Sequence, residues 1–187
     1  MIDPKELLFS LPTLEDRLPA GEQVEGVPAG AFHLHEDDWR QVEFVGMGEQ
    51  RLVETELHTL RSFAAQHRKG MGFTEVYVRR SRPHGLAGLH IDAKALASLL
   101  PPNVSHRPLV VGSAPWGPRV VNGYAVEIGP GAVLYVEIVG RHLAAAGLPL
   151  SWQRGASSSA DALLVTIGRT LKLRLVDWPA TTWVQLD

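Results

Sequence analysis

The stretch "AVLYVEIVGRHLAAA" (residues 132–146) decides which fold the second half of the chain adopts. Its first half is rich in β-branched residues and could pair back on the preceding strand across a turn at residues 129–131. Its second half is rich in alanine, which favours a helix. We expect a single helix that begins near Pro130, a residue suited to the first helical turn, and ends at Gly147, a residue suited to the C-terminal cap.

A weak internal repeat supports this helix. The segment "VEFVGMG" (42–48) precedes the strongest helical pattern of the chain, and "VEIGPG" (126–131) precedes the doubtful helix. Each helix would end at a glycine and lead into a strand that carries aromatic residues. The repeat therefore favours two related β–α–β units that pack side by side.

The other elements follow from hydrophobic spacing and from capping residues. Apolar residues three and four positions apart predict a helix over 49–69. A shorter helix is expected after Asp92, which suits an N-cap, and another after Ser159 or Asp161. Alternating and β-branched runs predict strands in the segments 32–35, 41–44, 73–80, 108–113, 120–128, 148–154, 171–178 and 181–186.

These elements indicate an α+β protein with a mixed or mainly antiparallel sheet and three to five helices. We divide the chain into an N-terminal arm (1–30) and two α/β halves (31–105 and 106–187) that pack as one compact unit. Each half would contain one of the β–α–β-like units.

Composition excludes several classes of protein. The 187 residues are 45% apolar and 20% charged, which is typical of a globular protein, and no cysteine is present. The formal net charge of −2, from 18 basic and 20 acidic residues, gives no reason to expect nucleic acid or an anionic membrane as a partner. No signal peptide or membrane span is evident, so we expect a soluble cytoplasmic protein. The abundance of alanine, glycine, arginine and proline suits a bacterial source.

One polar segment, "FHLHEDDWRQVEF" (32–44), gathers the candidate functional residues. His33 and His35 would lie on one face of a strand, and with Asp37 they form a set of ligands suited to zinc or iron. Glu36 or Asp38 would then act as the general base. The simpler interpretation, which we favour, is a strand–turn–strand in which these residues face solvent.

The same segment also suggests a binding surface. Arg40 requires an anionic partner if it is covered, and Asp38 or Glu36 is the expected one. We predict a contact surface made by Trp39, Arg40 and Glu43. Trp116, in the loop "SAPWGP", would add an exposed aromatic side chain to it.

Complete catalytic signatures are absent from the sequence. It contains no Gly-x-Ser-x-Gly elbow and no phosphate-binding loop ending in Gly-Lys-Ser/Thr. We therefore expect a non-enzymatic binding or accessory protein, such as a regulatory or immunity-type module, which has a protein partner or forms a homodimer and needs no cofactor. The alternative is a hydrolase that depends on a divalent metal, zinc or iron, held by His33, His35 and Asp37.

Overall fold

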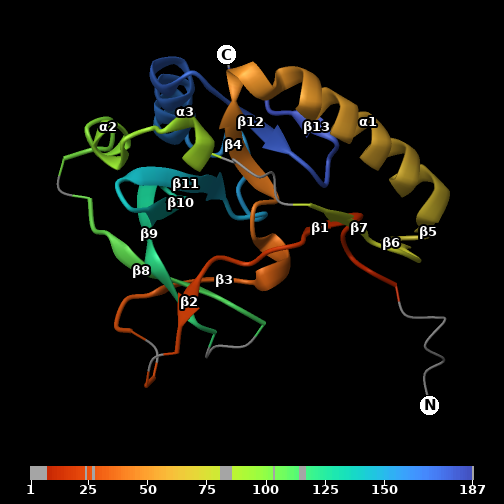
Figure 1. The fold of residues 1–187 in the computed structure, drawn as a ribbon, viewed down its shortest axis with the longest axis horizontal. Helices are drawn as coiled ribbons and strands as arrows, with labels where there is room; N and C mark the ends of the chain where they lie inside the picture. Colours follow the sequence, from red (N-terminus) through yellow and green to blue (C-terminus); the bar gives the residue numbers. More distant parts are fainter. Residues whose placement is uncertain are drawn as a thin grey trace.

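A mixed sheet of nine strands forms the centre of the molecule (Figure 1). The computed structural model describes residues 8–23, 25–26, 28–80, 86–102, 104–113 and 117–186. Eight strands follow the order β13-β12-β4-β11-β10-β9-β8-β3, and β2 pairs with β9 beside this path. All of these pairings are antiparallel except that between β3 and β8. The strands are β2 Gly21–Glu22, β3 Phe32–Leu34, β4 Val42–Gly46, β8 Arg107–Val111, β9 Arg119–Gly129, β10 Ala132–Val139, β11 His142–Leu148, β12 Leu173–Asp177 and β13 Thr182–Trp183.

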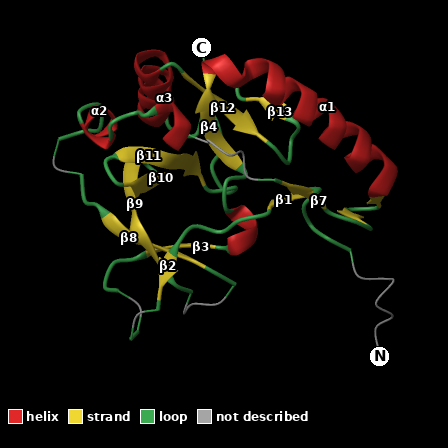
Figure 2. Ribbon diagram, in the orientation of Figure 1, coloured by secondary structure: helices red, strands yellow, loops and turns green. Residues whose placement is uncertain are grey.

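Two long helices cover opposite faces of the sheet (Figure 2). Because side chains alternate along a strand, Phe44 and Val45 of β4 point to opposite sides. Phe44 packs in a core with Leu164 and Ile167 of α3 (Ser158–Leu171). Val45 packs in a separate core with residues of α1 (Gln50–His67), namely Val53, Leu57 and Leu60.

The fold-class prediction of an α+β protein with three to five helices is wrong. The described residues contain the two long α-helices, one five-residue helix, α2 (Ala93–Ala97), and single turns of 3-10 helix, so the fold is dominated by its sheet. The predicted helix over 132–146 is absent, because these residues form β10 and β11. The β9, β10 and β11 strands run as consecutive hairpins, so the proposed repeat of β–α–β units does not exist.

The central position of β10 explains this error. A strand that is covered on both faces is apolar throughout and does not show the period-two pattern. Leu134, Tyr135 and Val136 are successive residues and are all fully buried. The alanines that suggested a helix lie in β11, where Ala145 and Ala146 pair with Glu137 and Val136 of β10. A Cβ added to Gly147 would lie 2.6 Å from the carbonyl oxygen of Val42 on β4.

Most other predicted elements are observed, with shifted boundaries, but the strand predicted over 148–154 is wrong, because residues 149–154 form loop and turn after β11. The helix expected over 49–69 is α1, and the side chain of Asp92 caps α2 by accepting a hydrogen bond from the Lys94 N–H at 2.9 Å. The cap of α3 is Ser157, not Ser159 or Asp161. No helix of the described residues is long and apolar enough to cross a membrane.

A small parallel sheet lies beside the main one. It consists of β1 (Thr13–Glu15) and β7 (Tyr77–Arg79), and the hairpin of β5 (Arg68–Lys69) and β6 (Gly72–Phe73) follows α1. Thr13 is fully buried, so part of the predicted surface arm (1–30) belongs to the interior. A dense group of charged side chains lies at the junction between the small sheet and β4.

Candidate functional site

The polar segment 32–44 forms β3, a single 3-10 turn η2 (Glu36–Asp38) and the first half of β4. Trp39 is only 1% exposed and stacks on Tyr135 of β10, with ring centroids 5.2 Å apart. Glu43 is 3% exposed. Two of the side chains predicted to contact a partner therefore lie in the interior, and Trp116 lies outside the described residues.

Arg40 joins the segment to its surroundings. Its Nε donates to Oε2 of Glu43 at 2.6 Å, and its Nη1 lies 3.4 Å from Oε1 of Glu15 on β1. The partners are therefore Glu43 and Glu15, and not Asp38 or Glu36 as the sequence suggested. The backbone of Arg40 has the left-handed φ of 55°, which directs its N–H to the hydroxyl oxygen of Tyr135 at 2.9 Å.

Arg79 of β7 completes the group, which we call the charge cluster: Glu15, Arg40, Glu43 and Arg79. Its Nη1 donates to Oγ1 of Thr13 at 3.0 Å and to Oε1 of Gln41 at 3.1 Å. Its Nη2 donates to the Arg40 carbonyl at 2.8 Å and lies 3.6 Å from Oε2 of Glu15.

Trp178, which follows β12, covers the charge cluster. Its Nε1 donates to Oε1 of Glu43 at 2.9 Å, and the guanidinium carbon of Arg79 lies 5.0 Å from its ring centroid. Both carboxylates of the charge cluster are thus engaged by cations, and one of them also accepts from an indole. Paired in this way, buried charges are tolerated in a protein interior.

Burial and pairing act in opposite directions on these groups. Burial opposes the charge of Arg40, but the carboxylates of Glu43 and Glu15 outweigh it and raise the pKa of Arg40 above its ordinary value. Burial lowers the pKa of Arg79, and the same carboxylates offset only part of that effect. Burial, together with the charge of Glu43, raises the pKa of Tyr135, so its phenol stays neutral.

The charge cluster leaves almost no space for a ligand. The hollow beside it, which Glu56 and Arg80 also line, has a volume of about 10 Å³. A volume of this order holds about one water molecule. The charge cluster therefore connects β1, β4 and β7 and does not form a substrate pocket.

The predicted metal ligands are only partly brought together. Nδ1 of His35 lies 3.5 Å from Oδ2 of Asp37 and accepts the Asp37 backbone N–H at 3.2 Å. His33 is an exposed residue of β3, at the edge of the sheet. Across the part of the chain that the structure describes, no three histidine, aspartate or glutamate side chains come close enough to hold a metal ion.

The candidate general bases occupy the 3-10 turn. Glu36 and Asp38 are half-buried residues of η2. Burial raises the pKa of Asp38, the charge of His35 opposes the shift, and Asp37 adds to it. A carboxyl group of this kind holds its proton more readily than a solvated one, but no described cavity opens onto it.

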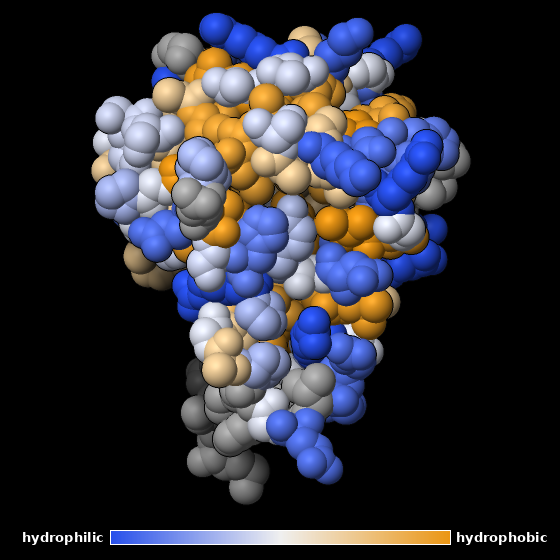
Figure 3. All heavy atoms as spheres, turned by 90° about the vertical axis from the view of Figure 1, so that its left-hand side faces the viewer, coloured by the Kyte–Doolittle hydropathy of each residue, from blue (hydrophilic) through white to orange (hydrophobic). Residues whose placement is uncertain are grey.

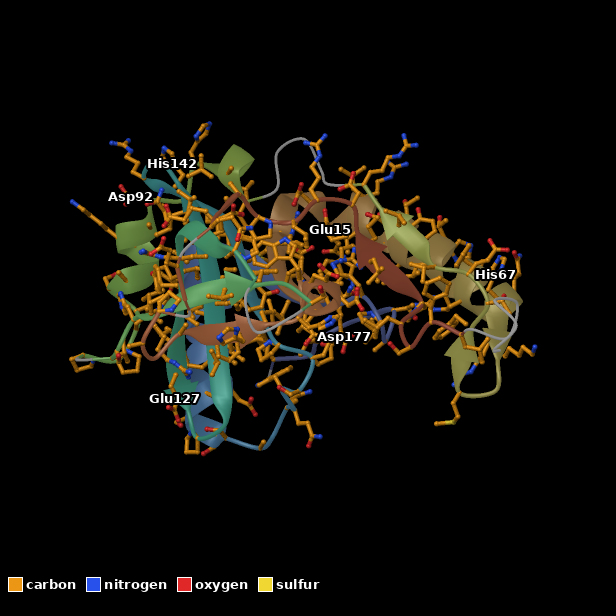
Figure 4. All side chains as sticks on the ribbon, turned by 90° about the horizontal axis from the view of Figure 1, so that it is seen from below. Glu15, His67, Asp92, Glu127, His142 and Asp177 are labelled. Carbon is orange, nitrogen blue, oxygen red and sulfur yellow. The ribbon has the colours of Figure 1, made fainter. Side chains whose placement is uncertain are left out.

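A second histidine pair lies elsewhere. His90 and His142 have ring centroids 5.2 Å apart, and Asp92 pairs with His142 through the backbone. Figure 4 shows Asp92 and His142 next to each other at one end of the molecule, Glu15 in its middle and His67 at the opposite end. His84 lies outside the described residues.

An exposed apolar surface surrounds Met47, the first residue of the 3-10 turn η3 (Met47–Glu49) between β4 and α1. A hollow of about 310 Å³ separates Met47 from Leu89 of η4 (Ala87–Leu89). A second hollow of about 160 Å³ lies between Met47, α3 and the C-terminal residues Val184 and Leu186. We call the two hollows, which share Met47, the Met47 groove. Met47 is 51% exposed and Leu89 is 41% exposed.

The charged residues that line the Met47 groove are all basic: Arg169, Lys172 and Arg174. Arg174 lies over the ring of Trp183, with its guanidinium carbon 4.2 Å from the centroid. Among the described residues, none of the three side chains forms an ion pair with a carboxylate. This arrangement is the reverse of the charge cluster, where each cation has an anionic partner.

Two other surface hollows also contain charged residues. Figure 3 shows apolar residues in the upper part of the face that carries α2 and α3, interrupted by polar ones. One hollow, of about 420 Å³ and lined by Val104 and Ile128, also contains Arg107 and Glu127, charges of both signs. Another, of about 440 Å³ beside α1, contains Arg61 and Arg68, and Arg61 already donates to the Thr181 carbonyl at 2.8 Å.

Comparisons with known proteins add no functional information. No protein-family model matches the chain, and no curated protein or solved structure is significantly similar to it. The argument for function therefore rests on the geometry of the described residues.

Sequence reasoning missed the Met47 groove. Its only local signal was an apolar side chain between two glycines, Gly46 and Gly48, which is also typical of a tight turn. Leu89, Lys172 and Arg174 come from distant segments, and only the fold brings them to Met47. In the same way, Glu15 was assigned to a surface arm, and nothing near it in the sequence indicates that it would pair with Arg40 and Arg79.

Proposed function

We propose that this chain is a cytoplasmic binding protein without catalytic activity, which recognises a partner protein through the Met47 groove. An accessory, regulatory or immunity-type role fits this description. The supporting observation is that the buried charge cluster is satisfied internally, whereas the apolar Met47 groove carries three cations that have no anionic partner among the described residues.

The charge cluster is closed to ligands, whereas the Met47 groove is open to them. Catalytic groups require access to a substrate, and the charge cluster has space for about one water. Recognition surfaces combine exposed apolar anchors with charges that have not yet found partners. Met47 and Leu89 supply the anchors, and Arg169 and Lys172 supply the charges.

Site-specific cross-linking tests the proposal. A photoreactive amino acid is placed at Met47 and, as a control, at Met71, which is 96% exposed in the turn between β5 and β6. In the source cells, we expect an adduct of one defined mass from position 47 and none from position 71. Excess unmodified protein should compete with this adduct, and excess Met47→Asp protein should not.

The result that would contradict the proposal is equally clear. An absence of any adduct at position 47, or adducts of equal yield at both positions, would show that the Met47 groove is not a recognition surface. A defined partner makes the regulatory or immunity-type assignment directly testable by measuring the activity of that partner with and without this chain.

One contact supports the alternative of a metal-dependent hydrolase: His35 and Asp37 lie within 3.5 Å of each other. Thermal unfolding of the protein is measured with added zinc and, under anaerobic conditions, with added iron(II). A metal at a free concentration of 100 times its dissociation constant stabilises the folded state by about 2.7 kcal/mol. A shift of this size that disappears in His33→Ala and His35→Ala variants would favour the hydrolase over the binding protein.

A further inference from the structure

We propose that the Met47 groove binds an acidic amphipathic helix of a partner protein. This inference rests on the proposed function, because it specifies the chemistry of the partner segment. Three features support it: the shape of the Met47 groove, its charge, and the lack of a carboxylate partner for that charge among the described residues.

The shape favours a segment that offers several apolar side chains from one face. The two hollows lie on either side of Met47, and each is lined by aliphatic residues such as Leu89, Ile91 and Val184. Gly46 permits Leu89 to approach the end of β4, since a Cβ at this position would lie 2.7 Å from Cδ1 of Leu89. An amphipathic helix places apolar residues at positions i, i+3, i+4 and i+7, and this spacing suits adjoining hollows.

The charge favours a segment with carboxylates beside its apolar stripe. Among the described residues, the charged ones that line the hollows are Arg169, Lys172 and Arg174. The positive character is local, because the whole chain has a formal net charge of −2. Carboxylates brought to these cations would gain attraction without breaking an existing ion pair, which increases both the rate and the specificity of association.

Alternative occupants fit less well. A basic helix would meet three cations of the same sign. A membrane surface is usually recognised by about four to eight clustered basic residues, more than the Met47 groove provides. A second copy of the chain would bring the same basic surface to an isologous contact, where like charges face one another near the symmetry axis.

Three synthetic peptides test the proposal by fluorescence anisotropy with the full chain. The first is a helix with leucine at i, i+3, i+4 and i+7 and glutamate on the remaining face. The second keeps the leucines and replaces every glutamate by lysine. The third has the composition of the first, with the leucines distributed around the helix. We expect the first peptide to bind at least ten times more tightly than either of the others.

Variants connect this binding to the Met47 groove. Met47→Asp and Arg169→Glu are both exposed substitutions and should each weaken binding of the first peptide at least fivefold. The matched control Met71→Asp should leave it unchanged. Raising the salt concentration should weaken binding to the native chain, and the effect should be smaller for Arg169→Glu.

Each contrary outcome overturns the inference. Equal binding of the acidic and basic peptides, or of the acidic and redistributed peptides, would remove the charge or the shape argument. Binding of vesicles of anionic phospholipid that depends on Met47 would assign the Met47 groove to a membrane. A dimer in sedimentation analysis that Met47→Asp dissociates would assign it to a second copy of the chain.

Failure of the inference is distinguishable from failure of the proposed function. If none of the peptides binds while position 47 still cross-links to a defined partner, the Met47 groove recognises a protein of different chemistry and only the inference fails. If position 47 does not cross-link, the proposed function fails as well.

Discussion

Arginine side chains stand in two contrasting settings in this molecule. In the charge cluster, Arg40 and Arg79 are buried, and hydrogen bonds or ion pairs connect them to Glu15 and Glu43. In the Met47 groove, Arg169 and Arg174 adjoin an apolar hollow and have no carboxylate partner among the described residues. The first setting contributes to the stability of the fold, and the second is available to another molecule.

This contrast shows how the charges of a protein can be interpreted from their surroundings in the structure. A dense group of titratable side chains attracts attention as a potential active site, but full pairing and a hollow of about 10 Å³ assign the charge cluster a structural role. Unpaired cations beside exposed apolar residues are less conspicuous in the sequence. They are the better indication of binding, because the interactions that satisfy them are still to be made.

The largest expected effect comes from breaking the charge cluster. Arg79→Met removes the donor to the Arg40 carbonyl and to Oε1 of Gln41, and takes one of its cations from Glu15. Removing one partner of a buried ion pair costs about 3–5 kcal/mol. Urea denaturation measures the loss. Arg80→Ala, at the exposed neighbouring position, is the control and should change the free energy of unfolding by less than about 0.5 kcal/mol. Similar losses in both variants would show that the charge cluster is not the source.

The next effect isolates a single hydrogen bond of the charge cluster. Trp178→Phe removes the indole donor to Glu43, and a hydrogen bond to a charged group contributes about 1.5–3 kcal/mol. Trp183→Phe is a matched control, because the indole N–H of Trp183 is buried without a hydrogen-bond partner in the described structure. Trp178→Phe should therefore cost more in chemical denaturation. A larger loss for Trp183→Phe would contradict the role assigned to Trp178.

Much of the local structure was predictable because its causes are local. The spacing of apolar residues predicted α1, and Asp92 was correctly identified as the cap of α2. The position of β10 is a tertiary property, since a doubly covered strand has the same apolar composition as a buried helix segment. The alanines of β11 illustrate the same limit, because strand pairing with β10 overrides their helix propensity.

The candidate site was less predictable than the fold. The sequence indicated that Arg40 needs a carboxylate, but it pointed to Asp38 and Glu36, which are near in the chain. The actual partners are Glu43, on the following strand, and Glu15, which β1 brings from 25 residues away. The Met47 groove depends on four separate segments that meet only after folding, so no local pattern identifies it.

A smaller effect on stability concerns Asp177, a half-buried carboxylate without a cationic partner among the described residues. Asp177, at the end of β12, accepts the Ala180 N–H at 2.8 Å, and burial raises its pKa, although this hydrogen bond opposes the shift. The pKa of Asp177 is about 3.9 in the unfolded chain and higher in the folded state. At pH values between these two pKa values, the folded state binds more protons than the unfolded chain. The stability contribution is therefore greatest at low pH and is lost as pH rises through the folded pKa.

Asp177→Asn removes this titration and keeps an oxygen acceptor for Ala180. We expect the variant to be more stable than the native chain at pH 7, and the difference to shrink as pH falls below the unfolded pKa. Denaturation in urea at several pH values measures both quantities. Parallel pH profiles of the variant and the native chain would show that Asp177 is not destabilised by its burial.

The smallest expected effect on stability lies in the Met47 groove. Met47 is 51% exposed, so Met47→Asp should change the free energy of unfolding by less than about 0.5 kcal/mol. The new carboxylate would lie near the cations of the Met47 groove, which compensates for the lost apolar contact. Val45→Ala, two residues earlier at a buried position, deletes two methyl groups and should cost about 1.5 kcal/mol. If Met47→Asp proved as costly as Val45→Ala, Met47 would belong to the core, and the contrast between a closed charge cluster and an open Met47 groove would fail.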